Sequence, residues 1–228
     1  MPRSARIVIP DIPHHITQRG NNRQAVFLTD RDHLDYLAIL KKQCKRYDLT
    51  VHGYCLMTNH VHLVATPGRE NSLARALGRA HHLYSQRFNR HHGRSGHLWQ
   101  SRFYSCPLDD EHLIHALVYV DRNPVRARLV PNPSDWPWSS ARAHIGKDDP
   151  PGLLDLNAWR AFSKGIDWDK LILDEQDSTV VDRLRRHTHC GRPLGSERFV
   201  ELIEKALGYP VRLEKRGRPK VNRKKERE

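Results

Sequence analysis

The stretch His60-Val61-His62-Leu63-Val64-Ala65 decides the fold of this chain of 228 residues. Its alternation predicts a β-strand, because successive strand side chains point to opposite faces. His60 and His62 therefore share one face, while Val61 and Leu63 point into the opposite layer. Two imidazoles on one face of a rigid strand are suited to holding a metal ion or bracing a phosphate. The alternative is chance, since 16 residues of the chain are histidines.

The segments around this strand predict the order β-α-β-β-α-β. The expected strands are 14–19, 51–57, 60–66 and 97–106, and the expected helices run from Thr29 or Asp30 to about Tyr47 and from Asn71 or Ser72 to about Gly93. This order indicates an α+β fold of the ferredoxin-like, split βαβ type, with a central antiparallel sheet. The two helices would cover one face of the sheet and leave the face of His60 and His62 open.

Each predicted helix carries an apolar stripe that is expected to face the sheet. The stripes consist of Leu34, Leu37, Leu40, Cys44 and Tyr47 in the first helix, and of Leu73, Leu77, Ala80, Tyr84 and Phe88 in the second. The histidine pairs at 81–82 and 91–92 are expected on the solvated side of the second helix. Trp99, in the predicted fourth strand, is expected in the core.

A third helix is expected over residues 109–124, and it is placed to bear a nucleophile. Asp109 is its expected cap, and Pro124 forces a stop near Asn123. At about 100° per residue, Tyr119 and Asn123 lie together on the side opposite the apolar stripe. The plainer alternative is a surface tyrosine beside a helix-ending asparagine.

The charge of the chain points to a polyanionic partner. The net charge is +13 and the isoelectric point is near 9.9, which favours nucleic acid. Residues 212–228 hold nine Lys or Arg against three Glu, so this tail alone carries a net +6. A basic tail can be no more than a solvated end, but the rest of the chain keeps an excess of its own.

Composition also excludes several classes of protein. No apolar run approaches the roughly 18 residues of a membrane span, and Pro10 and Asp11 interrupt the only amino-terminal apolar stretch, so neither a membrane protein nor a signal peptide is expected. No two of the four cysteines have the CxxC spacing of a zinc ribbon. Reduced thiols in a cytoplasm are the simplest expectation.

The carboxy-terminal part is expected to form a separate unit. Residues 148–152 read as a linker, which divides the chain into a main domain over 1–147, a small helical appendage over 148–211 that could bind DNA, and a basic disordered tail over 212–228. Helices are expected over 179–186 and 197–207. The tail residues Lys215, Arg216 and Arg218 flank Gly217 as in an AT-hook, which would bind the minor groove of A·T-rich duplex.

Four motifs in order along the chain resemble those of a known family. They are His60-Val61-His62, Gly96-His97-Leu98-Trp99-Gln100-Ser101-Arg102-Phe103, Tyr119-Val120-Asp121-Arg122-Asn123-Pro124-Val125-Arg126-Ala127 and Ser134-Asp135-Trp136-Pro137-Trp138-Ser139-Ser140. Together they resemble the REP-associated tyrosine transposases, a branch of the single-tyrosine HUH (His-hydrophobe-His) transposases. The resemblance covers residues 5–146. One departure is Ala141, where relatives often carry tyrosine, at a position peripheral to the chemistry.

The resemblance implies a metal-dependent single-stranded DNA endonuclease and strand transferase. His60, His62 and Asn123 would bind a divalent cation, Mg²⁺ or Mn²⁺, although imidazoles by themselves favour zinc. Tyr119 would attack the scissile phosphate, which gives a 5′-phosphotyrosine link and a free 3′-hydroxyl. A second DNA end could then reverse the step and complete the strand transfer.

Further DNA contacts are expected around this centre. The residues assigned to them are Gln100, Arg102, His115, Arg122 and Arg126. His115 could instead be a ligand or a proton acceptor, and Tyr104 is the rival nucleophile. His14 and His15 are expected to serve the first strand or the DNA path.

The expected partner is a single-stranded DNA hairpin formed by a palindromic repeat, in a bacterial, cytoplasmic and nucleoid-associated setting. The short connection from Cys106 to Asp109 favours a tyrosine that acts in its own subunit and a monomer, with a dimer left open. A non-catalytic nucleic-acid-binding protein on the same fold is the alternative, and it would leave Tyr119 without a role. A His-triad phosphohydrolase is excluded because position 64 is valine.

Overall fold

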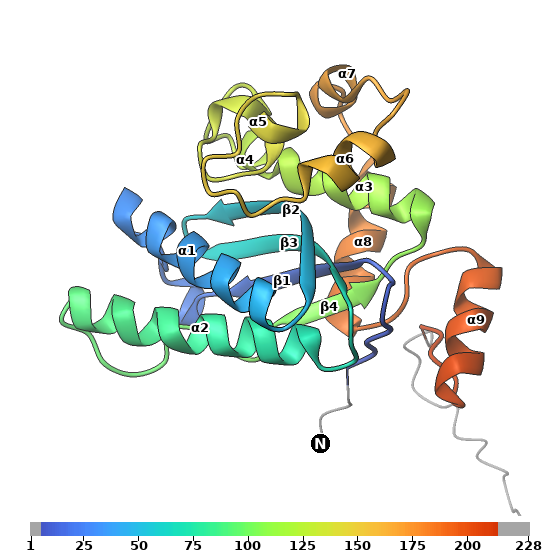
Figure 1. The fold of residues 1–228 in the computed structure, drawn as a ribbon, viewed down its shortest axis with the longest axis horizontal. Coiled ribbons are helices and arrows are strands. Elements are labelled where there is room, and N and C mark those ends of the chain that lie inside the picture. Colours follow the sequence, from blue (N-terminus) through green and yellow to red (C-terminus); the bar gives the residue numbers. More distant parts are fainter. Residues whose placement is uncertain (1–5, 214–228) are drawn as a thin grey trace, which may run out of the picture.

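The computed structural model describes residues 6–213, and within them a four-stranded sheet lies between two layers of helices (Figure 1). The strands are β1 (His14–Arg19), β2 (Leu49–Met57), β3 (His60–Pro67) and β4 (Tyr104–Pro107). Their order across the sheet is β2-β3-β1-β4, and every neighbouring pair is antiparallel. β1 and β2 therefore run in the same direction with β3 between them, which is the split βαβ arrangement. The predicted α+β fold with its central antiparallel sheet is confirmed.

Two long helices cover one face of the sheet, as the sequence predicts. These are α1 (Asp30–Arg46) and α2 (Ser72–His91), and the apolar residues of β3 that alternate with its histidines pack beneath them. Thr29 and Asp32 form a capping box that starts α1, because each side chain accepts a hydrogen bond from the other's backbone N–H. Leu34 is an exception to the predicted stripe, since its side chain is exposed.

The expectation that the histidines of α2 are solvated is wrong for two of them. His81 is buried, and its Nε2 lies 3.1 Å from the hydroxyl of Tyr36 on α1. His92, which follows the last residue of α2, bonds to the carboxylate of Asp32 at 2.9 Å. Both imidazoles therefore connect α2 to α1.

The second face of the sheet is covered as well, by the helix expected over 109–124, which the sequence places within reach of the histidines, and by α8 (Ser178–Cys190), which it does not. α3 (Asp110–Asp121) and the short α4 (Asn123–Arg126) lie across β2 and β3, and α8 packs against β1 and β4. Gly53 of β2 permits the close approach of α3, because a Cβ at this position would lie 2.7 Å from the side chain of Leu117. A pocket remains between these helices and the sheet.

The fourth strand is shorter than the predicted 97–106. Residues 98–100 make isolated backbone hydrogen bonds near the end of β1. The amide of Asn21 donates to the carbonyl of Leu98, and the amide of Gln100 donates to the carbonyl of Arg19. The regular ladder stops at the pair Thr17–Tyr104, although β1 continues to Arg19. The next bridge, between Gly20 and Trp99, is shifted by two residues from that register, so residues 100–103 break the strand. Pro107 is the last residue of β4 rather than its breaker, and an edge strand tolerates its missing N–H. Trp99 packs against the core, as expected.

The remaining helices add to both sides of the molecule. α5 (Ala141–His144), α6 (Leu156–Phe162) and α7 (Trp168–Leu173) lie near the outer side of α3, with the 3-10 turns η1 (Asn21–Arg23) and η2 (Pro133–Asp135) in loops (Figure 1). α9 (Glu197–Leu207) packs on Ile7 in a small core of its own. Helices are thus found where 179–186 and 197–207 were predicted.

Two sets of expectations on the carboxy-terminal part stay predictions. The AT-hook-like residues Lys215, Arg216 and Arg218 lie outside the described residues. The division of the chain into domains at residue 147 also stays a prediction. None of the helices within 6–213 combines the length and the apolar character needed to cross a membrane.

Candidate functional site

A pocket of about 560 Å³ opens between β1, β3, α4 and α8, with the carboxy-terminal part of α3 as its floor. Six of the predicted site residues line it: His60, His62, Gln100, Tyr119, Asn123 and Arg126. Arg19, Arg23 and Arg185 add positive charge, and the described residues that line the pocket include no Asp or Glu. The pocket is therefore suited to an anionic ligand.

The two histidines of β3 present their Nε2 atoms as acceptors. His60 Nδ1 lies 2.6 Å from Asn59 Oδ1, and the amide nitrogen of Asn59 donates to a backbone carbonyl, which fixes this oxygen as the acceptor. The N–H of His60 is therefore on Nδ1, and its Nε2 carries a lone pair. Burial, followed by the charge of Arg19, lowers the pKa of His60 to about 4. Burial also lowers the pKa of His62, so both rings are neutral at pH 7.

A chain of three side chains fixes the orientation of His62. The Thr188 hydroxyl on α8 donates to the carbonyl of Leu184 at 2.7 Å, so it accepts from His15 Nδ1, also at 2.7 Å. His15 Nε2 is then an acceptor, and it receives the Nδ1–H of His62 at 3.1 Å. The lone pair of His62 is therefore on Nε2, as it is in His60. Burial lowers the pKa of His15 to about 3, which keeps it neutral within this chain.

Tyr119 lies against this histidine pair and is only 4% exposed. Its ring meets those of His15 and His62 edge-on, at centroid separations of 5.5 and 5.4 Å. Its hydroxyl accepts a hydrogen bond from Nε of Arg185 on α8 at 3.3 Å. The alternative of a surface tyrosine is therefore wrong, because α8 covers the side of α3 that the sequence alone leaves polar.

Asn123 and Arg126 complete the wall one turn beyond Tyr119. Asn123 is buried, and its Oδ1 accepts a hydrogen bond from Arg126, whose guanidinium carbon also lies 4.1 Å from the centre of the Tyr119 ring. The Nδ2 of Asn123 is buried without a partner within the described residues. Burial lowers the pKa of Arg126, although this guanidinium stays charged at neutral pH.

The donors around the pocket suit a divalent cation. No cluster of three or more His, Cys, Asp or Glu suited to a metal occurs within residues 6–213, so a site made only of these residue types is not available there. Two fixed imidazole lone pairs together with the amide oxygen of Asn123 form a mixed nitrogen and oxygen set. A carbonyl oxygen has two lone pairs, so its bond to Arg126 leaves one for a cation.

The other predicted contact residues lie in different places. Arg102 lines a neighbouring pocket instead of this one. Arg122 donates to the carbonyl of Ile172 on α7 at 2.8 Å, and His115 lies 4.0 Å from Glu111 on the same helix. Neither Arg122 nor His115 is among the residues that line the Tyr119 pocket. Tyr104, the rival nucleophile, lies at the pocket wall with its ring stacked on His189.

Sequence reasoning left His15 open between the first strand and the DNA path, and it missed Arg185 and Thr188 as parts of the site. The period of the first strand places His15 on one face, but only the register of β1 with β3 shows that this is the face of His62. Arg185 and Thr188 come from α8, more than sixty residues beyond Tyr119. No spacing in the sequence connects that helix to the histidine pair.

The amino-terminal half of the chain matches a known family. The family model described as Transposase IS200 like matches residues 9–123. A Haemophilus influenzae protein assigned to the REP-associated tyrosine transposases is 27% identical over 150 residues, which cover 59% of this chain and 85% of that protein. A solved structure of a REP-associated tyrosine transposase bound to a REP hairpin shares the fold, with a TM-score of 0.53 and 23% identity over 68% of this chain and 90% of that one.

Proposed function

The chain belongs to the IS200-like transposase family, and we propose that it is a metal-dependent single-stranded DNA endonuclease and strand transferase. The observation that carries this proposal is the position of Tyr119. Its ring lies on the His15–His62 pair and its hydroxyl bonds to Arg185, in a pocket lined by further arginines. A tyrosine with a purely structural role would not need a cationic pocket at its hydroxyl.

Tyr119 is proposed to attack the scissile phosphorus through Oη. The new bond joins Oη to phosphorus, and the bond from phosphorus to the 3′ oxygen breaks. The phenol loses its proton, and the leaving oxygen takes one to become a free 3′-hydroxyl. The DNA strand then remains attached through a 5′-phosphotyrosine link, so the energy of the phosphodiester is kept for strand transfer.

Arg185 and Arg126 provide the electrostatic stabilisation in this reaction. The Nε–H of Arg185 that contacts Oη stabilises negative charge on the attacking oxygen. Arg126 lies against the same ring and bonds to Asn123, so its charge is held beside the phosphate position. A guanidinium group can also donate two parallel hydrogen bonds to two oxygens of one phosphate, and this bidentate contact would orient the strand in the pocket.

His60, His62 and Asn123 are proposed to hold Mg²⁺ or Mn²⁺. The support is their donor set, in which both imidazoles are neutral with Nε2 lone pairs set by Asn59 and His15. The bound cation would neutralise charge on the scissile phosphate. Imidazoles favour zinc, so the choice among these metals is a matter for measurement.

The proposed substrate is a DNA hairpin from a palindromic repeat with an unpaired flank. The solved relative that shares the fold of this chain is bound to a REP hairpin. The similar Haemophilus influenzae protein is assigned to the same group of transposases. The positive pocket also suits a single strand, since buried Tyr119 is reached more easily by an extended strand than by a duplex. Arg19 and Arg23 at the pocket edge are available for the strand's phosphates.

The test is cleavage of end-labelled hairpin oligonucleotides with Mg²⁺ or Mn²⁺, resolved on denaturing gels. We expect a slowly migrating covalent adduct with the native protein. The adduct of the native protein should need the metal, and it should be absent from both Tyr119→Phe and His62→Ala. Specific binding without cleavage under any metal or hairpin would instead indicate a non-catalytic nucleic-acid-binding protein on this fold.

A further inference from the structure

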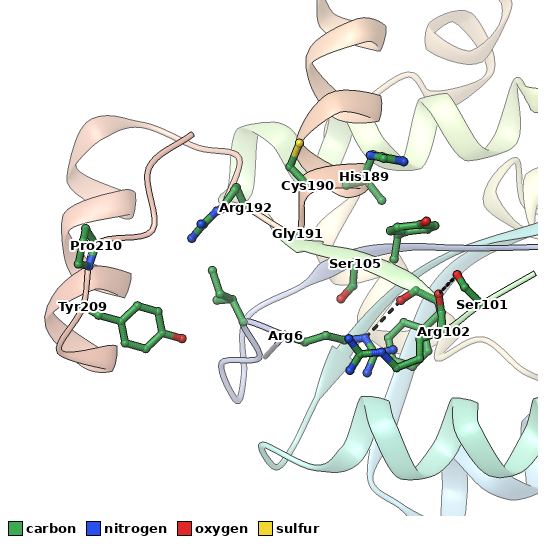
Figure 2. A pocket seen from close by; sticks show the side chains of 14 residues that line it. Arg6, Ser101, Arg102, Ser105, His189, Cys190, Gly191, Arg192, Tyr209 and Pro210 are labelled. Atoms are coloured by element: carbon green, nitrogen blue, oxygen red, sulfur yellow. Dashed lines mark hydrogen bonds between the residues drawn. The ribbon is translucent and has the colours of Figure 1, made fainter. Parts of the chain in front are cut away.

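A second pocket, of about 650 Å³, adjoins the Tyr119 pocket (Figure 2). It is bounded by the edge of β4, the end of α8, the chain after α9 and the segment before β1. Tyr104, Thr188 and His189 line both pockets, so the two pockets adjoin at these residues. A strand in the first pocket that passes Tyr104 and His189 would enter the second.

The second pocket is strongly basic. Arg6, Arg102 and Arg192 line it, and Figure 2 shows the guanidinium groups of Arg6 and Arg102 close together. Burial, followed by the charge of Arg102, lowers the pKa of Arg6 to about 10. None of the three forms an ion pair within residues 6–213, and no described lining residue is acidic. Adjacent guanidiniums without a carboxylate favour an anion, and phosphate matches their geometry.

A buried hydroxyl without a partner also faces this pocket. Ser105, on β4, is 4% exposed, and its Oγ makes no hydrogen bond within the described residues. Figure 2 shows its side chain directed toward Arg6. Buried polar atoms are rarely left unpaired, so this Oγ indicates a missing ligand with hydrogen-bonding atoms.

Aromatic rings line the same pocket. The Tyr104 and His189 rings are stacked, at a centroid distance of 4.8 Å, in the wall that both pockets share. Tyr209, after α9, lies across from Arg6 and is 44% exposed. Exposed rings beside arginines are the arrangement by which proteins bind the bases and phosphates of single strands.

We propose that this pocket binds an unpaired nucleotide that flanks the scissile phosphate, with its phosphate at Arg6 and Arg102 and its base against Tyr209 or the Tyr104–His189 stack. The inference rests on the proposed function, because the strand enters from the Tyr119 pocket. One wall of the pocket comes from Arg6 and residues 188–210, which lie outside the residues that match the family, and the other side comes from residues 101–105 within them. The packing of α9 on Ile7 holds this wall in place.

The test measures the affinity of a labelled hairpin whose unpaired thymidine flank is lengthened one nucleotide at a time to about eight, on either side in turn. The native protein should gain about tenfold in affinity at the length that reaches the pocket. Arg102→Ala/Arg192→Ala should lose this gain. The matched control is Arg75→Ala/Arg79→Ala, which removes two exposed charges from α2 and should keep the gain.

A base analogue separates stacking from charge. 2-Aminopurine at the flank position that gives the gain should be quenched in the native complex. It should become bright in Tyr209→Leu when the base lies on Tyr209, or in His189→Leu when the base lies on the Tyr104–His189 stack; quenching that persists in both variants would overturn the stacking. Equal losses in the two double variants at every flank length would overturn the proposal. If the native protein gains affinity with flank length but forms no adduct on Tyr119, the proposed function alone is contradicted. If it forms the adduct but gains no affinity at any flank length, this inference alone is contradicted.

Discussion

At the scale of single residues, the hydrogen bonds of His15 decide which nitrogen of His62 faces the pocket. Thr188 accepts a hydrogen bond from His15 Nδ1, so the N–H of His15 is on Nδ1. His15 Nε2 then accepts from His62 Nδ1, so the N–H of His62 is also on Nδ1. Partners of this kind, one step behind a ligand, fix its tautomer and its ring orientation. Residues outside the predicted motifs therefore prepare the predicted ones for binding.

Thr188→Val should weaken metal binding by about tenfold to a hundredfold, because valine cannot accept the hydrogen bond from His15 Nδ1. Isothermal titration with Mn²⁺ measures the affinity, and nitrogen NMR of labelled histidine reports the tautomer of His62. Thr188→Ser keeps the hydroxyl and serves as the control. An unchanged affinity together with an unchanged tautomer in Thr188→Val would contradict the role of this chain of hydrogen bonds.

Arg185→Ala should slow formation of the covalent adduct by about a hundredfold, because the attacking oxygen loses its charged donor. The side chain is half-exposed, so the free energy of unfolding should change little. Single-turnover rates with saturating hairpin measure the effect. Arg183→Ala, on the same exposed helix but outside the pocket, is the matched control, and equal rates for the two variants would exclude the proposed role.

At the scale of elements, a buried carboxylate holds the helix that carries Tyr119. Asp121, at the end of α3, accepts hydrogen bonds from Ser140, from His144 at 2.6 Å and from the indole of Trp168 at 3.0 Å. These partners come from two segments that follow α3 in the chain. They fix the end of α3 beside the sheet, and so they fix the height of Tyr119 over the histidines.

Asp121→Asn should lower the free energy of unfolding by about 3 kcal/mol, since it removes a buried charge that three donors share. Urea denaturation followed by tryptophan fluorescence measures this change. Asp110→Asn, in the exposed first turn of the same helix, should cost only a few tenths of that value. Similar losses in both variants would show that Asp121 has no special role in holding α3.

At the scale of the whole molecule, the sequence predicts what local periodicity controls. Alternation in residues 60–66 and the stripes of the two long helices give the sheet and its first layer correctly. Long-range contacts account for the differences: α8 covers Tyr119, the β1–β4 ladder stops at the pair Thr17–Tyr104, and Tyr36 and Trp99 pack on His81. Each of these depends on a partner that no local pattern names.

Stability should fall as the solution is acidified, and His81 should contribute to that loss. Burial, followed by the charge of Arg6, lowers the pKa of His81 from 6.5 to about 3, so the unfolded chain takes up the proton first. The contribution of neutral His81 to the free energy of unfolding is fully present above pH 6.5. It is lost as the pH falls toward 3, by about 1.4 kcal/mol per pH unit.

His81→Gln keeps a hydrogen-bonding group for Tyr36 but does not titrate in this range. Its free energy of unfolding should therefore decline less between pH 6.5 and pH 4.5 than that of the native protein. Urea denaturation at several pH values compares the two slopes, with His82→Gln, on the exposed side of α2, as the control. Parallel slopes for the native protein and His81→Gln would refute the assignment.

The most direct measurement on the central claim is mass spectrometry of the protein after reaction with a hairpin and Mn²⁺. Proteolysis followed by fragmentation should place a nucleotide, joined through a 5′-phosphate, on Tyr119. The same experiment on Tyr119→Phe should give no modified peptide. A nucleotide found on Tyr104, or an unmodified protein beside cleaved DNA, would contradict the account of Tyr119 as the nucleophile.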